Sequence, residues 1–283
     1  MDLIETLRST GATRDFRDEP VPDDVVHRVL DTARFGPSGG NRQGWRVVLV
    51  KDLEIRRQLR DLYLPGWYEY LAMVRAGLTP FAPVTDRRAE AAALLEAASI
   101  AEAAAAGPGG FAEHLDEVPV LLVLLADLRA LAATDRDLDR YTIVGGASVY
   151  PFAWNLLLAA RAEGLGGVIT TMHARREAEV KALLGAPDEL AFAATIALGH
   201  PVEQVRRLTR APVEEIATVD RIDGRPVAVL APIPDAGPRE RLRASGGTVP
   251  ATLAIEDLPA PPAPPAGALL PSAALAELHA DER

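Results

Sequence analysis

Residues 36–45 read Gly36-Pro37-Ser38-Gly39-Gly40-Asn41-Arg42-Gln43-Gly44-Trp45 and join an amphipathic segment at 22–35 to an apolar segment at 45–50. Pro37 should end the first segment as a helix, because its nitrogen cannot donate a helical hydrogen bond. The glycines permit positive φ angles and let a flat ligand approach the backbone. Ser38, Asn41 and Gln43 add hydrogen-bonding side chains. This composition is typical of a ligand-binding turn, although an ordinary glycine-rich connection between a helix and a strand would also satisfy it.

Apolar strand-like segments alternate with helical segments on both sides of this turn. We expect helices over 2–9, 22–35, 53–76, 86–106, 141–163 and 174–184, and strands over 45–50, 119–126, 168–171 and 191–198. Pro65-Gly66 should interrupt the third helix and Pro151 should kink or break the fifth. The continuous apolar run at 45–50 predicts a central, buried strand. The alternation predicts an α/β fold with at least four strands.

The composition is that of an acidic chain with an ordinary globular core. Its 283 residues are 48% hydrophobic and 25% charged, and the formal net charge is −10. Nucleic-acid binding needs a basic surface, so we expect no nucleic-acid partner. The longest apolar stretch, 118–126, is far shorter than the about 20 residues that span a bilayer, so we expect no membrane partner. The chain has no cysteine, and its start lacks the apolar core of a signal peptide, so we expect a cytoplasmic protein without disulfides.

Prolines crowd the chain after about residue 230, with alanine and glycine between them. This composition favours extended, poorly packed chain. We therefore expect a folded domain over 1–230 and a Pro/Ala-rich flexible tail over 231–283, in which only 272–280 has helical character. The alternative for part of the tail is a segment that wraps a partner subunit.

Residues 37–45 resemble the signature loop of the nitroreductase family of FMN-dependent oxidoreductases, usually written Ala-Pro-Ser-x-x-Asn-x-Gln-Pro-Trp. Further blocks with the family's pattern follow in its order, at 13–22, 159–167 and 197–201. The resemblance brackets about residues 5–220. It implies an α/β (α+β) three-layer sandwich with a central mixed sheet flanked by helices. It also implies an intertwined homodimer, with the helix expected at 141–163 near the two-fold axis.

The resemblance further implies FMN as cofactor and NAD(P)H as co-substrate. Arginine suits the FMN phosphate because its planar fork makes paired, charge-assisted hydrogen bonds. The phosphate candidates are Arg8, Arg14, Arg207 and Arg210. The candidates along the flavin are Pro37, Ser38, Gly39, Asn41, Gln43, Gly166, Gly167 and Thr170. An isolated arginine is more often a surface residue, Asn41 could instead cap the turn, and Thr170 could be an ordinary strand residue.

One departure from the family pattern concerns the phosphate. Many members have Arg-Arg-Ser where this chain has Thr10-Gly11-Ala12, so the leading arginine and the serine are missing. We expect either Arg8 or backbone N–H groups near Gly11 to take their place. Gly44 also replaces the usual proline before Trp45, a smaller change because both residues suit a turn.

The sequence offers no side chain that we would name as catalytic. The five histidines show no metal-ligand spacing, and no Gly-x-Gly-x-x-Gly follows a strand. The resemblance implies ping-pong hydride transfer from NAD(P)H through the flavin to a small acceptor, aromatic or nitro/quinone-like. Tyr63, Trp67, Tyr68 and Tyr70 could cover such an acceptor or could pack between helices. The alternatives are a specialised relative (dehalogenase-like or flavin-destructase-like), a non-catalytic flavin-binding or sequestering protein, and a structural α/β dimer.

Overall fold

The computed structural model describes residues 2–228. The chain divides into two compact units, residues 1–210 and 211–283. The expected tail at 231–283, with its helical stretch at 272–280, lies outside the described residues, and the domain boundary near residue 230 stays a prediction. The described part of the second unit contains the short helix α8 (Val213–Ile216) and a bridge between Thr218 and Pro226.

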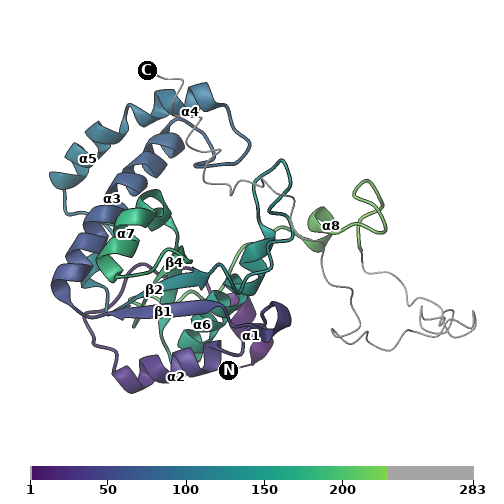
Figure 1. The fold of residues 1–283 in the computed structure, drawn as a ribbon, viewed down its shortest axis with the longest axis horizontal. Coiled ribbons are helices and arrows are strands. Elements are labelled where there is room, and N and C mark those ends of the chain that lie inside the picture. Colours follow the sequence, from purple (N-terminus) through teal and green to yellow (C-terminus); the bar gives the residue numbers. More distant parts are fainter. Residues whose placement is uncertain (1, 229–283) are drawn as a thin grey trace, which may run out of the picture. The chain divides into compact units, whose positions relative to one another are not determined.

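The first unit alternates helices and strands (Figure 1). Its helices are α1 (Leu3–Ser9), α2 (Asp23–Ala33), α3 (Leu53–Arg75), α4 (Arg87–Leu94), α5 (Ala97–Ala105), α6 (Tyr150–Ala162) and α7 (Glu177–Leu184). Its strands are β1 (Trp45–Val50), β2 (Val120–Asp127), β3 (Gly166–Thr170) and β4 (Leu190–Gly199). Short 3-10 turns are η1 (Gly39–Asn41), η2 (Leu115–Glu117), η3 (Val144–Ser148) and η4 (Met172–Arg176). None of the helices among residues 2–228 is both long and apolar enough to cross a membrane.

The strands form one sheet in the order β1-β2-β4-β3, and every neighbouring pair is antiparallel. The mixed sheet that we expected is therefore antiparallel in these four strands. Among the described residues, parallel pairing occurs at an isolated bridge between Ala12 and Gly167. The prediction that 45–50 is a central strand is wrong, because β1 lies at the edge and its middle residues are only partly buried. The apolar run arises instead because helices cover both faces of the sheet.

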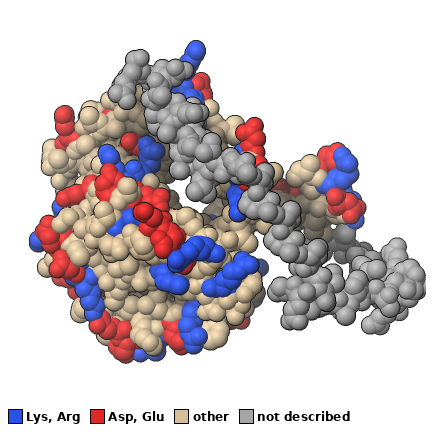
Figure 2. All heavy atoms as spheres, viewed as in Figure 1, with Lys and Arg blue, Asp and Glu red and all other residues tan. Residues whose placement is uncertain are grey.

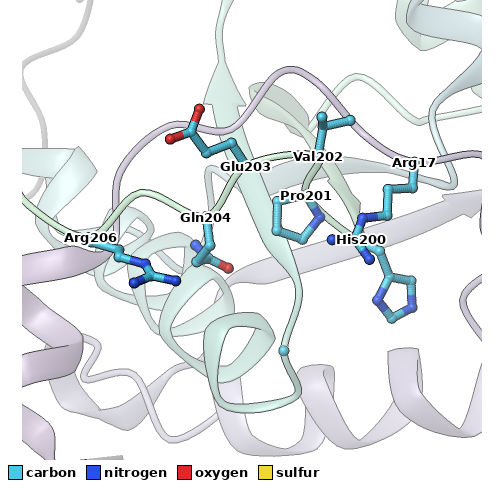
Figure 3. A pocket seen from close by; sticks show the side chains of 8 residues that line it. Arg17, His200, Pro201, Val202, Glu203, Gln204 and Arg206 are labelled. Carbon is cyan, nitrogen blue, oxygen red and sulfur yellow. The ribbon is translucent and has the colours of Figure 1, made fainter.

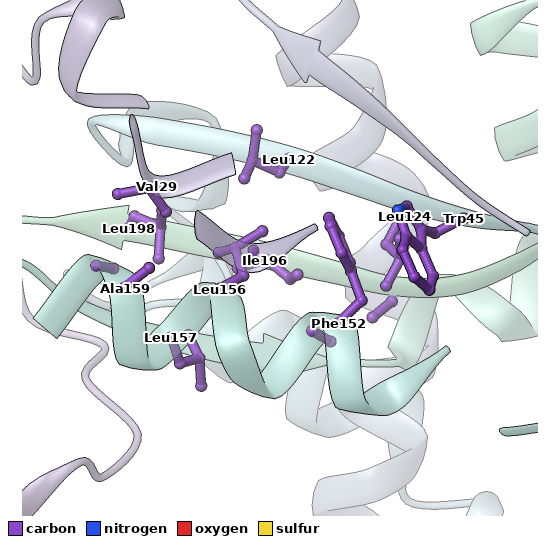
Figure 4. Close-up of a cluster of buried hydrophobic side chains, with 14 of the residues drawn as sticks. Val29, Trp45, Leu122, Leu124, Phe152, Leu156, Leu157, Ala159, Ile196 and Leu198 are labelled. Carbon is purple, nitrogen blue, oxygen red and sulfur yellow. The ribbon is translucent and has the colours of Figure 1, made fainter. Parts of the chain in front are cut away.

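Helices cover the two faces of the sheet, as Figure 1 shows. Successive residues of a strand point to opposite faces. Leu122 and Leu124 of β2 join a buried cluster with α2 and α6 (Figure 4), whereas Leu121 and Val123 join a cluster with α3 and α7. This confirms the predicted three-layer α/β sandwich.

Three helical predictions need correction. Helix α3 continues through Pro65-Gly66, because buried residues on both sides of Pro65, including Leu59 and Met73, hold it in place. The segment 86–106 forms two helices that separate at residues 95–96. Residues 141–149 are not α-helical. The helix begins at Tyr150, and Pro151 occupies the first turn, where no backbone N–H is needed.

Candidate functional site

The turn between α2 and β1 is held in an uncommon backbone conformation. Gly40, Asn41 and Gln43 have φ angles of 61°, 52° and 51°. For residues with a side chain, this left-handed region costs roughly 1–2 kcal/mol, with asparagine the most tolerant. The turn is anchored at its end, where the Trp45 ring stacks on Phe152 of α6 at a centroid distance of 5.0 Å. Retained backbone strain of this kind is concentrated at functional sites.

The polar side chains of the turn hydrogen-bond to one another. The Gln43 N–H donates to Ser38 Oγ over 3.0 Å, and Gln43 Nε2 donates to Asn41 Oδ1 over 3.2 Å. The Gly39 N–H donates to Ser148 Oγ over 3.0 Å, which ties the turn to η3. These hydrogen bonds stabilise the turn from within. For Asn41 this agrees with the alternative that its side chain caps the turn. Contact of Ser38, Asn41 and Gln43 with a flavin stays a prediction, as it does for Pro37 and Gly39.

Three of the four predicted phosphate arginines come together in one place. A cavity of about 650 Å³, which we call the basic pocket, lies between α1, α6 and the segment that follows β4. Its lining residues are Leu7, Arg8, Trp154, Arg206, Arg207, Leu208 and Arg210. Arg206 escaped the sequence analysis, although the Arg206-Arg207 pair was the signal that could have identified it.

Among residues 2–228, the arginines of the basic pocket have no acidic partner. No carboxylate in the described part of the chain lies within 4.0 Å of any of them. Elsewhere arginines do pair, as Arg28 does with Asp24 and Glu163, and Figure 2 shows charges of both signs interspersed on the face in view. Unpaired guanidinium groups that converge on one cavity are suited to an anion, above all a phosphate.

A second polar pocket of about 420 Å³ adjoins the same segment (Figure 3). Arg17 and His200 lie together at one end of it, and Arg206 lies at the other. Arg206 therefore lines both pockets. The chain that follows β4 is thus flanked by polar cavities along 200–210.

Arg14 lies apart from the other three predicted phosphate arginines. It lines a larger cavity of about 1160 Å³ together with Phe16, Arg56, Phe111 and His114 among others. The structure therefore does not bring Arg14 into the basic pocket. Its positive charge is close enough to Tyr63 to oppose the effect of burial, which raises the pKa of that phenol.

The two predicted glycines of β3 are packed by the chain itself. A Cβ atom on Gly166 would lie 2.6 Å from Thr13 Oγ1, and one on Gly167 would lie 2.4 Å from Leu198 Cδ2. The space that each glycine leaves is therefore filled by a neighbouring side chain. Close packing accounts for both glycines, and their use as a shelf for a flavin stays a proposal.

The other end of β3 carries a buried polar network that the sequence analysis missed. Thr170 Oγ1 hydrogen-bonds with the Tyr63 hydroxyl over 2.8 Å. Its cross-strand partner Thr195 lies 2.6 Å from His173 Nδ1, and His173 Nε2 lies 2.7 Å from the carbonyl oxygen of Leu59. That carbonyl can only accept, so Nε2 carries the proton and Nδ1 accepts from the Thr195 hydroxyl. Burial lowers the pKa of His173 to about 4, which keeps the imidazole neutral.

The aromatic residues of α3 pack on one another. Trp67 stacks on Tyr70 at 5.2 Å with an interplanar angle of 8°, and the ring of Tyr63 lies 6.5 Å from that of Trp67. Trp67, Tyr68 and Tyr70 are only partly buried, and Tyr63 is buried. This geometry agrees with the packing alternative, and a role over a bound acceptor stays a prediction.

The predicted site residues form separate groups within one chain. Thr170 pairs with Thr195, which is level with Val123 on β2 and Val48 on β1. Three strand spacings of about 4.8 Å therefore separate Thr170 from β1 by roughly 14 Å. The turn at 36–44 lies farther still along β1. The basic pocket, which Arg8, Arg207 and Arg210 line, includes no residue of that turn.

The geometry thus gives an α/β domain with a basic pocket suited to a phosphate and a strained polar turn. Family comparison is more specific, because the nitroreductase family model matches residues 7–200. The chain therefore belongs to the nitroreductase family, which confirms the resemblance found in the sequence.

The relatives cover most of the chain. It is 28% identical over 243 residues to the NADH dehydrogenase of Thermus thermophilus, a match of 76% of this chain and 95% of that one. It is 30% identical to the 5,6-dimethylbenzimidazole synthase of Rhodospirillum rubrum, over 69% of this chain and 82% of that one. The NADPH:FMN oxidoreductase from Vibrio harveyi, solved with NAD+, shares the fold with a TM-score of 0.53 at 21% identity, covering 77% of this chain and 76% of that one.

A separate likeness covers a smaller stretch. Over 70 residues, 25% of this chain, the sequence is 51% identical to Antitoxin VapB46 of Mycobacterium tuberculosis, and the match covers 67% of that protein.

Proposed function

We propose that the protein is an FMN-dependent oxidoreductase that passes hydride from NAD(P)H to a small acceptor, aromatic or nitro/quinone-like, in a ping-pong scheme. The basic pocket carries this proposal. It brings Arg8, Arg207 and Arg210 together with no carboxylate partner in the described residues, as a phosphate monoester requires. Bound FMN would supply the hydride chemistry, as cofactors do.

The residues present fit the phosphate end of FMN well. Arg8 and the arginines at 206, 207 and 210 can neutralise a phosphate dianion, and Trp154 gives the same cavity an apolar wall. Arg14 follows Thr13, whose N–H donates to the Gly167 carbonyl near the start of β3, and the Tyr63–Thr170 pair lies at the end of that strand. We assign these groups to orienting the ring. Donors aimed at the ring carbonyls would stabilise negative charge, as in an oxyanion hole.

We further propose that the complete site needs two copies of the chain. The turn at 36–44 is strained and polar, yet within one chain it lies more than roughly 14 Å from Thr170, and the basic pocket includes none of its residues. A homodimer could bring the turn of one copy to the pocket of the other. Multi-angle light scattering with absorbance detection tests this arrangement. We expect flavin only in the dimer peak, and a flavin-loaded monomer would refute it.

The enzyme proposal is tested by anaerobic titration of the FMN-loaded protein with NADPH and NADH. We expect the flavin absorbance near 450 nm to bleach with at least one of them. A protein that binds FMN but stays oxidised under excess reductant would instead be a flavin-binding or sequestering protein.

A specialised reaction is the alternative within the family. A flavin-destructase-like reaction is the first such alternative. The second is a dehalogenase-like reaction, which the 24% match to human iodotyrosine deiodinase 1 favours. Mass spectrometry of the products decides between these outcomes. Loss of intact FMN after reduction in air would indicate the first, and iodide release from iodotyrosine would indicate the second.

A second candidate function rests on the 70-residue likeness to an antitoxin. We propose that this stretch gives the chain an antitoxin-like capacity to bind a toxin. Co-expression with the toxin that VapB46 counteracts tests it. Restored growth would support the proposal, and unchanged growth arrest at equal protein levels would remove it.

A further inference from the structure

Arg161 is a buried arginine that forms no ion pair with any residue of the described chain. It lies in the last turn of α6 and is 9% exposed. Its Nη2 donates to Ser9 Oγ and to the carbonyl oxygen of Val205, each over 3.2 Å. Its Nε is buried and makes no hydrogen bond, and no carboxylate of residues 2–228 lies within 4.0 Å. Burial lowers the pKa of Arg161, the charge of Glu5 opposes this shift, and the charge of Arg206 adds to it.

Such an arrangement is unfavourable for stability alone. A buried charge without a counter-charge costs free energy, and apolar residues of similar size often stabilise a fold more. The position of Arg161 suggests what offsets this cost. Its two partners belong to the two segments that carry the basic pocket, because Ser9 follows Arg8 and Val205 precedes Arg206 and Arg207.

The same two segments are in close contact at Gly11. A Cβ atom there would lie 2.8 Å from Leu208 Cδ2 and 3.1 Å from Val205 Cγ1. Gly11 aligns with the second arginine of the family's Arg-Arg-Ser, one position after the leading arginine that Thr10 replaces. The missing side chain therefore leaves room for the 205–208 segment, which brings Arg206 and Arg207 with it.

We propose that Arg161 is a positioning residue that bridges Ser9 and Val205 and so holds Arg8, Arg206 and Arg207 in place for a phosphate monoester. The docked 205–210 segment takes over the role of the missing Arg-Arg-Ser motif. This inference rests on the proposed function, since FMN supplies the phosphate. A bound phosphate dianion would also provide the negative charge that Arg161 lacks.

The test compares FMN with riboflavin, which has the same ring and no phosphate. Flavin is removed from the full-length chain, and dissociation constants are measured by quenching of flavin fluorescence. The variants are Arg161→Met, which keeps an unbranched side chain without the charge, and Arg88→Met, the same change on an exposed arginine of α4.

We expect the unmodified chain to bind FMN at least about tenfold more tightly than riboflavin, as a charge-assisted phosphate contact implies. Arg161→Met should weaken FMN binding about tenfold and change riboflavin binding less than about twofold. Arg88→Met should change neither. Arg161→Lys should recover part of the loss, because it keeps the charge without the two-pronged geometry.

Two results would overturn the inference. If Arg161→Met weakens FMN and riboflavin equally, the residue supports the fold only. If the unmodified chain binds both flavins equally, the basic pocket does not hold the phosphate. Failure to bind either flavin would instead refute the proposed function. If Arg161→Met fails to fold, Ser9→Ala serves as the second variant, because it removes one hydrogen-bond partner of Arg161. Ser9→Ala should weaken FMN binding about two- to threefold and leave riboflavin binding unchanged. Unchanged FMN binding in this variant would also contradict the inference.

Discussion

Replacement of His173 by glutamine should remove a large part of the acid sensitivity of the fold. The imidazole is fully buried, donates to the carbonyl oxygen of Leu59 and accepts from Thr195, and burial lowers its pKa from 6.5 to about 4. The folded state therefore binds fewer protons than the unfolded state between these values. Stability falls as the pH drops from about 6.5 towards about 4, and the contribution is complete above about pH 7.5.

The size of the effect follows from the two pKa values. At about pH 5 the histidine is almost fully protonated when unfolded and about one-tenth protonated when folded. This difference amounts to about 2 kcal/mol, from 1.36 kcal/mol per pKa unit. Glutamine can keep both hydrogen bonds without titrating.

Urea unfolding at about pH 7.5 and about pH 5 measures this contribution. The unmodified protein should lose about 2 kcal/mol more unfolding free energy than His173→Gln between the two conditions. His114, whose pKa is raised by its hydrogen bond to the Pro108 carbonyl, is common to both proteins and cancels in the comparison. Equal losses in the two proteins would show that His173 is not held neutral by burial.

Three further predictions concern contacts in other parts of the described structure. A double-mutant cycle with Tyr63→Phe and Thr170→Val should give a coupling of about 1 kcal/mol, as a buried hydrogen bond implies; additive effects in urea unfolding would exclude a shared bond. Asp135→Asn should destabilise η3 by about 1.5–3 kcal/mol, because the carboxylate accepts from two backbone N–H groups and one arginine; hydrogen exchange over 143–148 would then rise, and unchanged protection would refute this. Gly11→Arg would introduce the second arginine of the family's Arg-Arg-Ser yet should weaken FMN binding, because a side chain there would collide with Leu208; tighter binding in a fluorescence titration would contradict the packing described here.

The strand positions could be predicted from the sequence where the local hydrophobic pattern agreed with the packing in the fold. The bounds predicted at 45–50 are those of β1, and the strand predictions at 119–126 and 191–198 differ from β2 and β4 by one residue at each end. The edge position of β1 could not be predicted, because an apolar run results from coverage on both faces and not from central placement. The helix through Pro65 also escaped prediction, because tertiary contacts of Leu59 and Met73 outweigh the local proline.

The candidate site was predicted in its parts but not in its assembly. The phosphate arginines were selected by residue type and motif, and three of them do converge. In the proposal above their pocket depends on Arg161, which contacts Ser9 across 152 residues of the chain, and on Gly11, which lies against Val205 and Leu208 near the other end of the domain. His173 lies in no recognisable sequence motif. Its burial between α3 and the sheet, which the sequence does not reveal, distinguishes it from a surface histidine.

The visible absorption spectrum of the purified full-length protein tests the central claim most directly, recorded before and after anaerobic addition of NADPH and then NADH. We predict a yellow protein, or one that takes up added FMN, whose flavin bands bleach with at least one reductant. A colourless protein that cannot be loaded with FMN would contradict the account, because the arginines of the basic pocket would then serve some other ligand.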